Sequence, residues 1–127
     1  MKLSKAAGLM AAALALAAPA AAQERSWMMI GRAEANGSGQ GTLEARQVEP
    51  FREIMICVNG GDVRFNQVGV RLRDGGSVDL RLRATVDDGD CSRFISLRGR
   101  REVAGMNFTH DPATLGGATA RVELFAR

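Results

Sequence analysis

One histidine and two nearby serines are the residues of this chain most suited to nucleophilic chemistry. His110 ends an apolar-polar segment and is followed by Asp111, a carboxylate that could orient it as a general base, with Ser92 or Ser96 as the nucleophile. No Gly-x-Ser-x-Gly turn, which exposes the serine in many hydrolases, accompanies them. A lone histidine at a strand end is more often a surface or satisfied polar residue. We therefore expect no catalytic residue, and we expect the protein not to be an enzyme.

A short acidic loop is the candidate for binding a metal. Asp87, Asp88 and Asp90 place three carboxylates within four residues, and calcium prefers such oxygen ligands. The spacing differs from that of an EF-hand loop, and no downstream glutamate is placed to complete it. Acidic turns are also common between strands. We expect no metal site and no cofactor, and we keep this loop as a weak candidate for calcium.

Four arginines could receive an anionic ligand. Arg71, Arg73, Arg81 and Arg83 alternate with apolar residues, so they should share the outward face of one hairpin. Guanidinium groups suit carboxylates, and this possible ligand or partner face could bind an anionic polymer of the cell envelope. The alternative is a solvated face with cross-strand pairs to residues such as Asp79, and charge runs usually serve solubility.

The two cysteines predict a structural disulfide. Cys57 and Cys91 form an even pair in a small domain that is expected to be exported. Two free thiols or a redox-active pair are the alternatives, but the C-x-x-C spacing that tunes redox thiols is missing. We expect no free thiol in the native protein and a loss of thermal stability on reduction.

The N-terminus has the three parts of a secretory signal peptide. Lys2 and Lys5 precede an apolar run through Ala6 to Ala18, and small residues surround Ala22, where cleavage is expected. The run is nearer 13 residues, whereas a membrane-spanning helix needs about 20. We therefore predict a signal peptide at 1–22, a single domain at 23–127, no membrane span in the mature chain, and a periplasmic or secreted location.

Charge and aromatic content exclude some classes of function. Without residues 1–22 the chain holds 15 arginines and 14 carboxylates, a net charge of +1. Such a balance lacks the basic footprint of a nucleic-acid-binding protein. The chain has no tyrosine, and we expect its one tryptophan, Trp27, to serve in core or edge packing. This weakens predictions of sugar binding or single-stranded nucleic-acid binding, which depend on exposed rings.

Alternation of apolar and polar residues with period two predicts an all-β domain. Turn residues such as those at 36–41, 59–62 and 74–76 separate the alternating segments. The pattern predicts an antiparallel β-sandwich, jelly-roll-like, of about eight or nine short strands. The predicted strands are 27–34, 42–48, 51–58, 62–66, 68–73, 78–85, 93–99, 101–110 and 118–126.

One hairpin and one strand allow finer predictions. The apolar residues on both sides of 74–76 are even-numbered, so they face each other across the hairpin only if the loop has an odd number of residues. A three-residue Asp74-Gly75-Gly76 loop with a left-handed glycine meets this condition and would place Arg71 opposite Asp79. In strand 51–58, one face is predicted to hold Ile54, Ile56 and Val58, and the other Phe51, Met55 and Cys57. The strand should therefore be covered on both sides, by a loop or strand or by a contact with another subunit.

Short motifs along nearly all of the mature chain carry a family resemblance. They are Trp27, Ile30-Gly31-Arg32, Phe51-Arg52-Glu53-Ile54, Val58, Val63-Arg64-Phe65, Val68-Gly69-Val70, the stretch Ser-Arg-Phe-Ile-Ser-Leu-Arg-Gly at 92–99, Phe108, and Ala120-Arg121-Val122-Glu123-Leu124-Phe125. Their order resembles a group of small exported bacterial β-sandwich domains of unknown function. The resemblance implies compartment and fold but no activity. Cys91 and His110 depart from its pattern, so the cysteine pair is not carried over from it.

These patterns leave three classes of function. We favour an exported protein with a structural or interaction role in the cell envelope, engaging an envelope protein or an anionic polymer. The second is a small binding module for calcium or an anionic glycan, and the third is a hydrolase centred on His110. No nucleic-acid partner is expected.

Overall fold

The computed structural model describes residues 26–127, and the predicted signal peptide lies outside them. The strands are β1 (Met28–Ala35), β2 (Gln40–Glu44), β3 (Pro50–Asn59), β4 (Val63–Leu72), β5 (Ser77–Asp79), β6 (Thr85–Val86), β7 (Ile95–Asp111) and β8 (Ala120–Ala126), with one 3-10 turn, η1 (Pro112–Leu115). The described residues form no α-helix, and none of their helical segments has the length and apolar character to cross a membrane.

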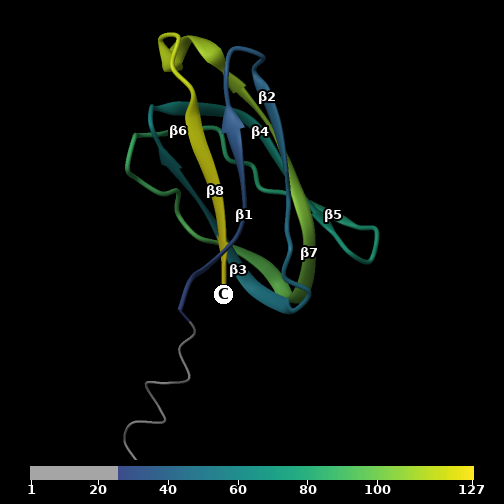
Figure 1. Ribbon diagram of the computed structural model, residues 1–127. Helices are drawn as coiled ribbons and strands as arrows, with labels where there is room; N and C mark the ends of the chain where they lie inside the picture. The colour runs from purple at the N-terminus through teal and green to yellow at the C-terminus, as the bar shows by residue number, and fades with distance from the viewer. Residues whose placement is uncertain (1–25) are drawn as a thin grey trace, which may run out of the picture.

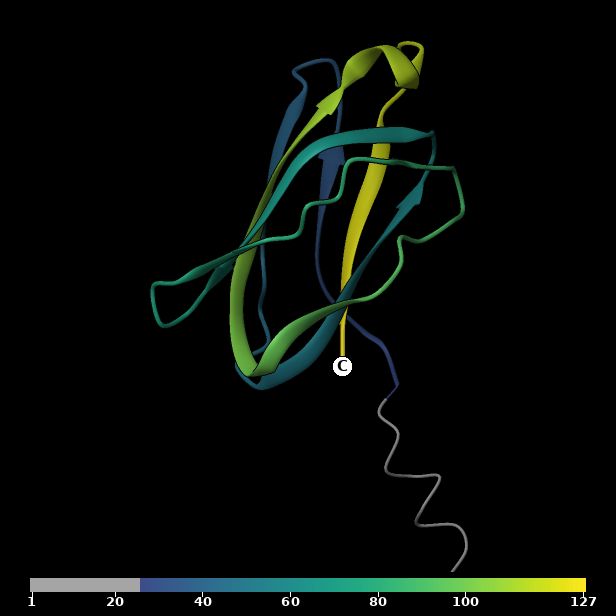
Figure 2. The ribbon, with the colours of Figure 1, turned by 180° about the vertical axis from the view of Figure 1, so that it is seen from behind.

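The strands form an antiparallel β-sandwich, as the alternation predicted (Figures 1 and 2). One layer has the order β1-β8-β3-β7, and the other consists of β2, β7, β4 and β5, with β6 beside β4. The long strand β7 belongs to both layers, because its first part pairs with β3 and its last part with β2 and β4. The apolar side chains lie between the layers, where Phe65 and Phe108 pack edge to face.

Two pairs of predicted strands are single strands interrupted by a bulge. The predicted strands 62–66 and 68–73 are β4, whose register against β7 shifts between Phe65 and Gln67. Before the shift the odd-numbered residues face the core, and after it the even-numbered ones do, so both Phe65 and Val68 are buried. The predicted strands 93–99 and 101–110 lie within β7, which turns at Arg98 (φ 61°) and Gly99 (φ 113°).

The hairpin between β4 and β5 has a loop with the predicted odd number of residues, but the two strands pair in a different register. Arg71 lies opposite Ser77, so the prediction that it faces Asp79 is wrong by two residues. Leu72 donates its N–H to the carbonyl of Gly76, which makes the three-residue loop Arg73-Asp74-Gly75. Gly75 takes the left-handed conformation (φ 96°) that such a loop requires. Strand β5 then ends at Asp79, well before the predicted end at residue 85.

Strand β3 lies between β8 and β7 and is covered on its outer side near its end. The prediction that Phe51 faces away from the core is wrong, because a register shift between Phe51 and Glu53 turns its ring inward, where it is 1% exposed. The segment before β7 pairs with the edge of β3, and Cys91 there is bonded to Cys57. A loop, and not a second subunit, therefore covers Cys57.

Candidate functional site

A groove lies on the outer face of the β2-β7-β4-β5 layer. Its volume is about 750 Å³, within the range of ligand sites in proteins. Strands β2, β7, β4 and β5 supply the walls and floor, and the β1-β2 turn contributes Ser38. The lining residues are Ser38, Gln40, Gly41, Thr42, Gln67, Val68, Gly69, Ser77, Val78, Asp79, Asn107, Phe108 and Thr109.

The strand register explains why these polar side chains face the same way. Residues directly opposite each other on neighbouring strands share a face of the sheet. Thr42, Asn107, Gly69 and Asp79 form one row across the four strands. Gln40, Thr109 and Gln67 form the next row, because the bulge in β4 turns Gln67 outward. The buried residues between these rows face the core, so the outer face is polar.

Most of the polar groups in the groove are available to a ligand. Within residues 26–127, the side chains of Gln40, Thr42, Gln67 and Thr109 make no hydrogen bond to the protein. Asn107 accepts one from Nε of Arg71 at 3.2 Å through its carbonyl oxygen, which leaves its two N–H donors. Amides and hydroxyls both donate and accept, so the groove offers hydrogen bonds of both kinds.

Gly69 on the groove floor is a strand glycine that packing does not require. A Cβ atom at Gly31 would lie 2.8 Å from the carbonyl oxygen of Glu44, one at Gly41 would meet the ring of Phe108, and one at Gly105 would meet Arg71 and a backbone oxygen. A Cβ at Gly69 would meet nothing within 4 Å, and its φ is not positive. Glycine weakens a strand and often marks close approach of a ligand.

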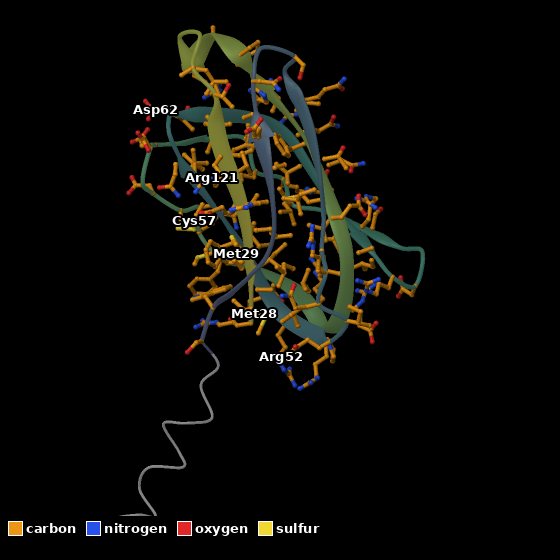
Figure 3. All side chains as sticks on the ribbon, in the orientation of Figure 1. Met28, Met29, Arg52, Cys57, Asp62 and Arg121 are labelled. Atoms are coloured by element: carbon orange, nitrogen blue, oxygen red, sulfur yellow. A yellow bond between two sulfur atoms is a disulfide. The ribbon has the colours of Figure 1, made fainter. Side chains whose placement is uncertain are left out.

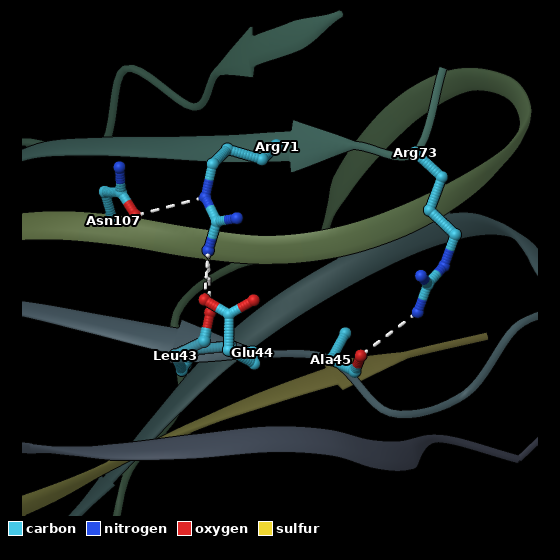
Figure 4. A network of polar contacts seen from close by, with 6 residues as sticks. All are labelled: Leu43, Glu44, Ala45, Arg71, Arg73 and Asn107. Carbon is cyan, nitrogen blue, oxygen red and sulfur yellow. Dashed lines mark hydrogen bonds and ion pairs between the residues drawn. The ribbon is translucent and has the colours of Figure 1, made fainter. Parts of the chain in front are cut away.

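The four arginines predicted to share a face are divided into two pairs. Arg71 reaches over β7 toward β2, where its guanidinium donates to the carbonyl of Leu43 at 3.2 Å and to a carboxylate oxygen of Glu44 at 2.7 Å (Figure 4). Arg73 donates to the carbonyl of Ala45 at 3.1 Å. These two arginines hold β4 to β2 and the segment after it.

Arg81 and Arg83 line a second hollow that continues the groove. This hollow has a volume of about 390 Å³ and shares Gln67 and Asp79 with the groove. Asp79 accepts a hydrogen bond from the backbone N–H of Arg81 at 3.0 Å, and Arg81 has a left-handed backbone (φ 52°). In the described part of the chain neither guanidinium has a hydrogen-bond or ion-pair partner.

The predicted disulfide is confirmed. Cys57 on β3 and Cys91 are bonded across a sequence separation of 34 residues. Ser92, beside the disulfide, donates its hydroxyl to its neighbour's carbonyl and accepts from the backbone N–H of Ile56 at 3.0 Å. Ser96 accepts from the backbone N–H of Arg98. Both serines therefore serve local backbone structure.

His110 lies in the core, 3% exposed, beside the ring of Phe108. Neither of its ring nitrogens has a hydrogen-bond partner in the described residues, so it is not the satisfied polar residue that the sequence suggested. The hydroxyls of Ser92 and Ser96 form hydrogen bonds with backbone groups, and none of these bonds involves His110. The structure therefore does not bring His110, Ser92 and Ser96 together in one site.

The acidic loop makes hydrogen bonds within the fold. Asp88 accepts from the N–H of Gly60 at 2.8 Å, and its own N–H donates to Asp62 at 2.8 Å. Asp87 and Asp90 are exposed, and the backbone N–H of Asp90 donates to the carbonyl of Asp87. Among residues 26–127 no three His, Cys, Asp or Glu side chains gather closely enough to hold a metal ion.

Sequence reasoning missed the groove because nearly all of its residues are neutral and they come from separate strands. Thr42, Asn107 and Gly69 look like ordinary polar positions of alternating strands, and only the pairing places them in one row. One signal was present in the sequence, since Gly69 takes an outward position within the alternating run from Val68 to Leu72, where a polar side chain is usual.

The structure thus defines a β-sandwich domain with a polar groove on one sheet. The chain belongs to the DUF2541 family, a domain of unknown function whose model matches residues 9–126. This confirms the predicted resemblance to small domains of unknown function. No curated protein matches the sequence.

The solved structures that resemble this chain are distant. AlgX of Pseudomonas aeruginosa is 11% identical with a TM-score of 0.52, and the alignment covers 79% of this chain and 26% of that chain. This chain therefore spans about a quarter of AlgX. A mutant of CBM29-2, a family 29 carbohydrate-binding module, is 9% identical with a TM-score of 0.44 and covers 81% of this chain and 92% of that one. At such identities the likeness to AlgX concerns the fold alone.

Proposed function

We propose that this protein is a non-catalytic, periplasmic or secreted module that binds a glycan of the cell envelope in the groove of the β2-β7-β4-β5 layer. The observation that carries the proposal is the floor at Gly69, which has no side chain although packing would allow one. Neutral amides and hydroxyls and the carboxylate of Asp79 surround it. Neutral amides and hydroxyls match sugar hydroxyls, which also donate and accept.

The groove favours a glycan over a peptide strand. The backbone groups of β7 and β4 are already paired within the sheet, so a peptide cannot add to this face by β-augmentation. The groove crosses four strands at about 4.8 Å spacing, so it is about 14 Å long perpendicular to the strands. This length accommodates several sugar rings. Since no aromatic ring is exposed in the groove, we expect modest affinity, with a Kd of about 0.1 to 1 mM, equivalent to about −5 to −4 kcal/mol.

An acidic glycan would suit the groove and its continuation together. Neutral sugar hydroxyls would lie over Gly69 and Asn107, while a carboxylate or sulfate would lie toward Arg81 and Arg83. Asp79 between the two parts accepts from Arg81 and could accept from sugar hydroxyls as well. This supports the anionic glycan of the sequence prediction, with one pair of the four arginines in place of all four. The calcium alternative has no comparable support.

The disulfide supports the proposed location. Structural disulfides persist in oxidising compartments such as the bacterial periplasm and the cell exterior. A glycan-binding module in such a compartment would attach the protein to envelope or extracellular polysaccharide.

Gly69→Val tests the proposal. Valine would fill the groove floor without a clash, and its β-branched side chain favours a strand, so the melting temperature should stay equal or rise. We expect the wild-type protein to bind glycans on an array of neutral and acidic polysaccharides, and the variant to bind at least tenfold more weakly.

Arg121→Val on the outer face of β8 is the matched control, because it adds the same side chain to an exposed strand position of the other layer. It should bind like the wild type. If no arrayed glycan retains the wild-type protein, or if Gly69→Val binds as well as Arg121→Val, the groove is not a glycan site.

A further inference from the structure

An aromatic pair, half-buried Trp27 and exposed Phe94, lies beside the start of β1 and Arg127. The rings of Trp27 and Phe94 are 6.1 Å apart, and the guanidinium of Arg127 lies over both, 4.4 Å from the centre of the tryptophan ring. Phe94 is 56% exposed and Met29 on the same side of the sheet is 39% exposed, although both are large apolar residues. Neighbouring exposed apolar side chains on a protein surface mark interaction sites.

Exposed arginines surround this pair. Arg93 adjoins Phe94, and the backbone N–H of Arg52 donates to the carbonyl of Arg127 at 2.8 Å. Arg98 and Arg100 lie opposite Arg52, where the register between β3 and β7 shifts. Figure 3 shows Met28 and Arg52 at the same end of the molecule. Met29 pairs with Phe125 on the outer face of the sheet, the face that Trp27 shares by alternation. We call this set the arginine-aromatic end: Trp27, Met29, Phe94, Arg52, Arg93, Arg98 and Arg100.

The backbone itself turns one of these arginines outward. Arg98 has a left-handed conformation (φ 61°), unusual for a residue with a side chain, and its N–H is held by the hydroxyl of Ser96 at 2.9 Å. Such local strain is most often kept at functional positions. The excursion at 98–100 therefore presents its two arginines to the solvent.

The positive charge of this end is only partly offset within the fold. Glu53 is paired with Arg127 at 2.8 Å, and Asp74 lies 3.7 Å from Arg101. In the part of the chain that the structure describes, the four arginines of the arginine-aromatic end make no ion pair. Glu49 and Glu102, near the paired ends of β3 and β7, offset half of this charge and leave an excess of two.

We infer that the arginine-aromatic end binds the surface of a bilayer that contains anionic phospholipid. Trp27, Met29 and Phe94 would enter the headgroup region, where amphipathic rings and apolar side chains are favoured, and the arginines would contact lipid phosphates. This surface is separate from the groove, with which it shares no residue.

The combination of side chains favours a membrane over other anionic partners. A nucleic acid would need rings free for stacking, and Arg127 already covers both Trp27 and Phe94. A soluble acidic polymer would use the arginines and leave the apolar side chains in water. A bilayer surface offers phosphates and an apolar layer together.

Trp27 makes the test direct, since it is the one tryptophan of the chain. The protein would be purified from the periplasm of an expression host, with its N-terminus checked by mass spectrometry, and titrated with vesicles of phosphatidylglycerol and phosphatidylcholine. We expect a blue shift of tryptophan emission and cosedimentation with mixed vesicles, both weakened by salt. No shift, or an equal response to pure phosphatidylcholine, would overturn the inference.

Variants separate this surface from the groove. Arg52→Gln combined with Arg93→Gln should weaken vesicle binding about thirtyfold, since each arginine near an anionic surface contributes a factor of about five to the binding constant. Phe94→Ser should reduce the blue shift. Arg121→Gln on β8, which removes one arginine charge outside the arginine-aromatic end, is the control and should bind vesicles nearly as well as the wild type. Gly69→Val should bind vesicles like the wild type. If the double variant binds vesicles as well as Arg121→Gln does, or if soluble heparin gives the same blue shift, the inference is wrong.

Discussion

His110 has an environment that costs the fold stability. It is almost fully buried next to Phe108, and no protein group in the described chain satisfies its two ring nitrogens. A buried polar group without a partner costs about 1 to 3 kcal/mol. We expect His110→Leu to raise the free energy of unfolding by about 1 kcal/mol, as measured by urea denaturation, because leucine has similar volume and no polar atoms to bury.

Phe108→Leu is the matched control for that prediction. This variant places a leucine at the residue that contacts His110, but it also removes a ring that packs edge to face on Phe65. Losing this packing should lower the free energy of unfolding by about 1 kcal/mol or more. If His110→Leu is destabilising by as much as Phe108→Leu, the imidazole has a partner in solution, such as a bound water, that offsets its burial.

At the scale of the elements, Arg71 connects three strands of one layer. It starts on β4, passes over Gly105 of β7, and ends on the Leu43 carbonyl and Glu44 of β2. The absence of a side chain at Gly105 makes room for the guanidinium. We expect Arg71→Lys to lower the free energy of unfolding by about 1 kcal/mol, because an ammonium group cannot make the forked contacts of a guanidinium. Chemical denaturation would measure the loss.

Glu44→Gln distinguishes the two kinds of contact that Arg71 makes. The side chain of Glu44 is 69% exposed, so its ion pair with Arg71 is screened by water. Exposed ion pairs contribute about 0 to 1 kcal/mol. We therefore expect this variant to cost less than Arg71→Lys. The reverse order would mean that the ion pair, and not the bonds to Leu43 and Asn107, holds the strands.

Over the whole molecule, local patterns in the sequence predicted what is local in the structure. Alternation gave the sandwich and most strand positions, and the cysteine count gave the disulfide. The bulges at Asn66 and Arg52 were not predictable, because each is defined by the partner strand and reverses which residues face the core. The groove has the same origin: Thr42 and Asn107 are far apart in sequence, and only strand pairing brings them together.

The disulfide acts on the whole molecule because it closes a loop that contains β4, β5 and β6. The segment at 89–92 is also held to β3 by backbone hydrogen bonds, such as Val58 N–H to the Asp90 carbonyl at 3.0 Å. The native fold should therefore survive reduction at low temperature. A crosslink over 34 residues acts mainly on the unfolded chain, whose conformational entropy it lowers. This should stabilise the fold by about 3 to 4 kcal/mol.

We therefore expect dithiothreitol to lower the melting temperature by more than about 10 °C, as for a domain of this size losing such stability, while glycan binding at 10 °C is unchanged. Cys57→Ala combined with Cys91→Ala should melt like the reduced protein, and dithiothreitol should not affect it. If reduction instead abolished binding at low temperature with little change in melting, the crosslink would be shaping the native groove, and its main effect would lie in the folded state rather than in the unfolded chain.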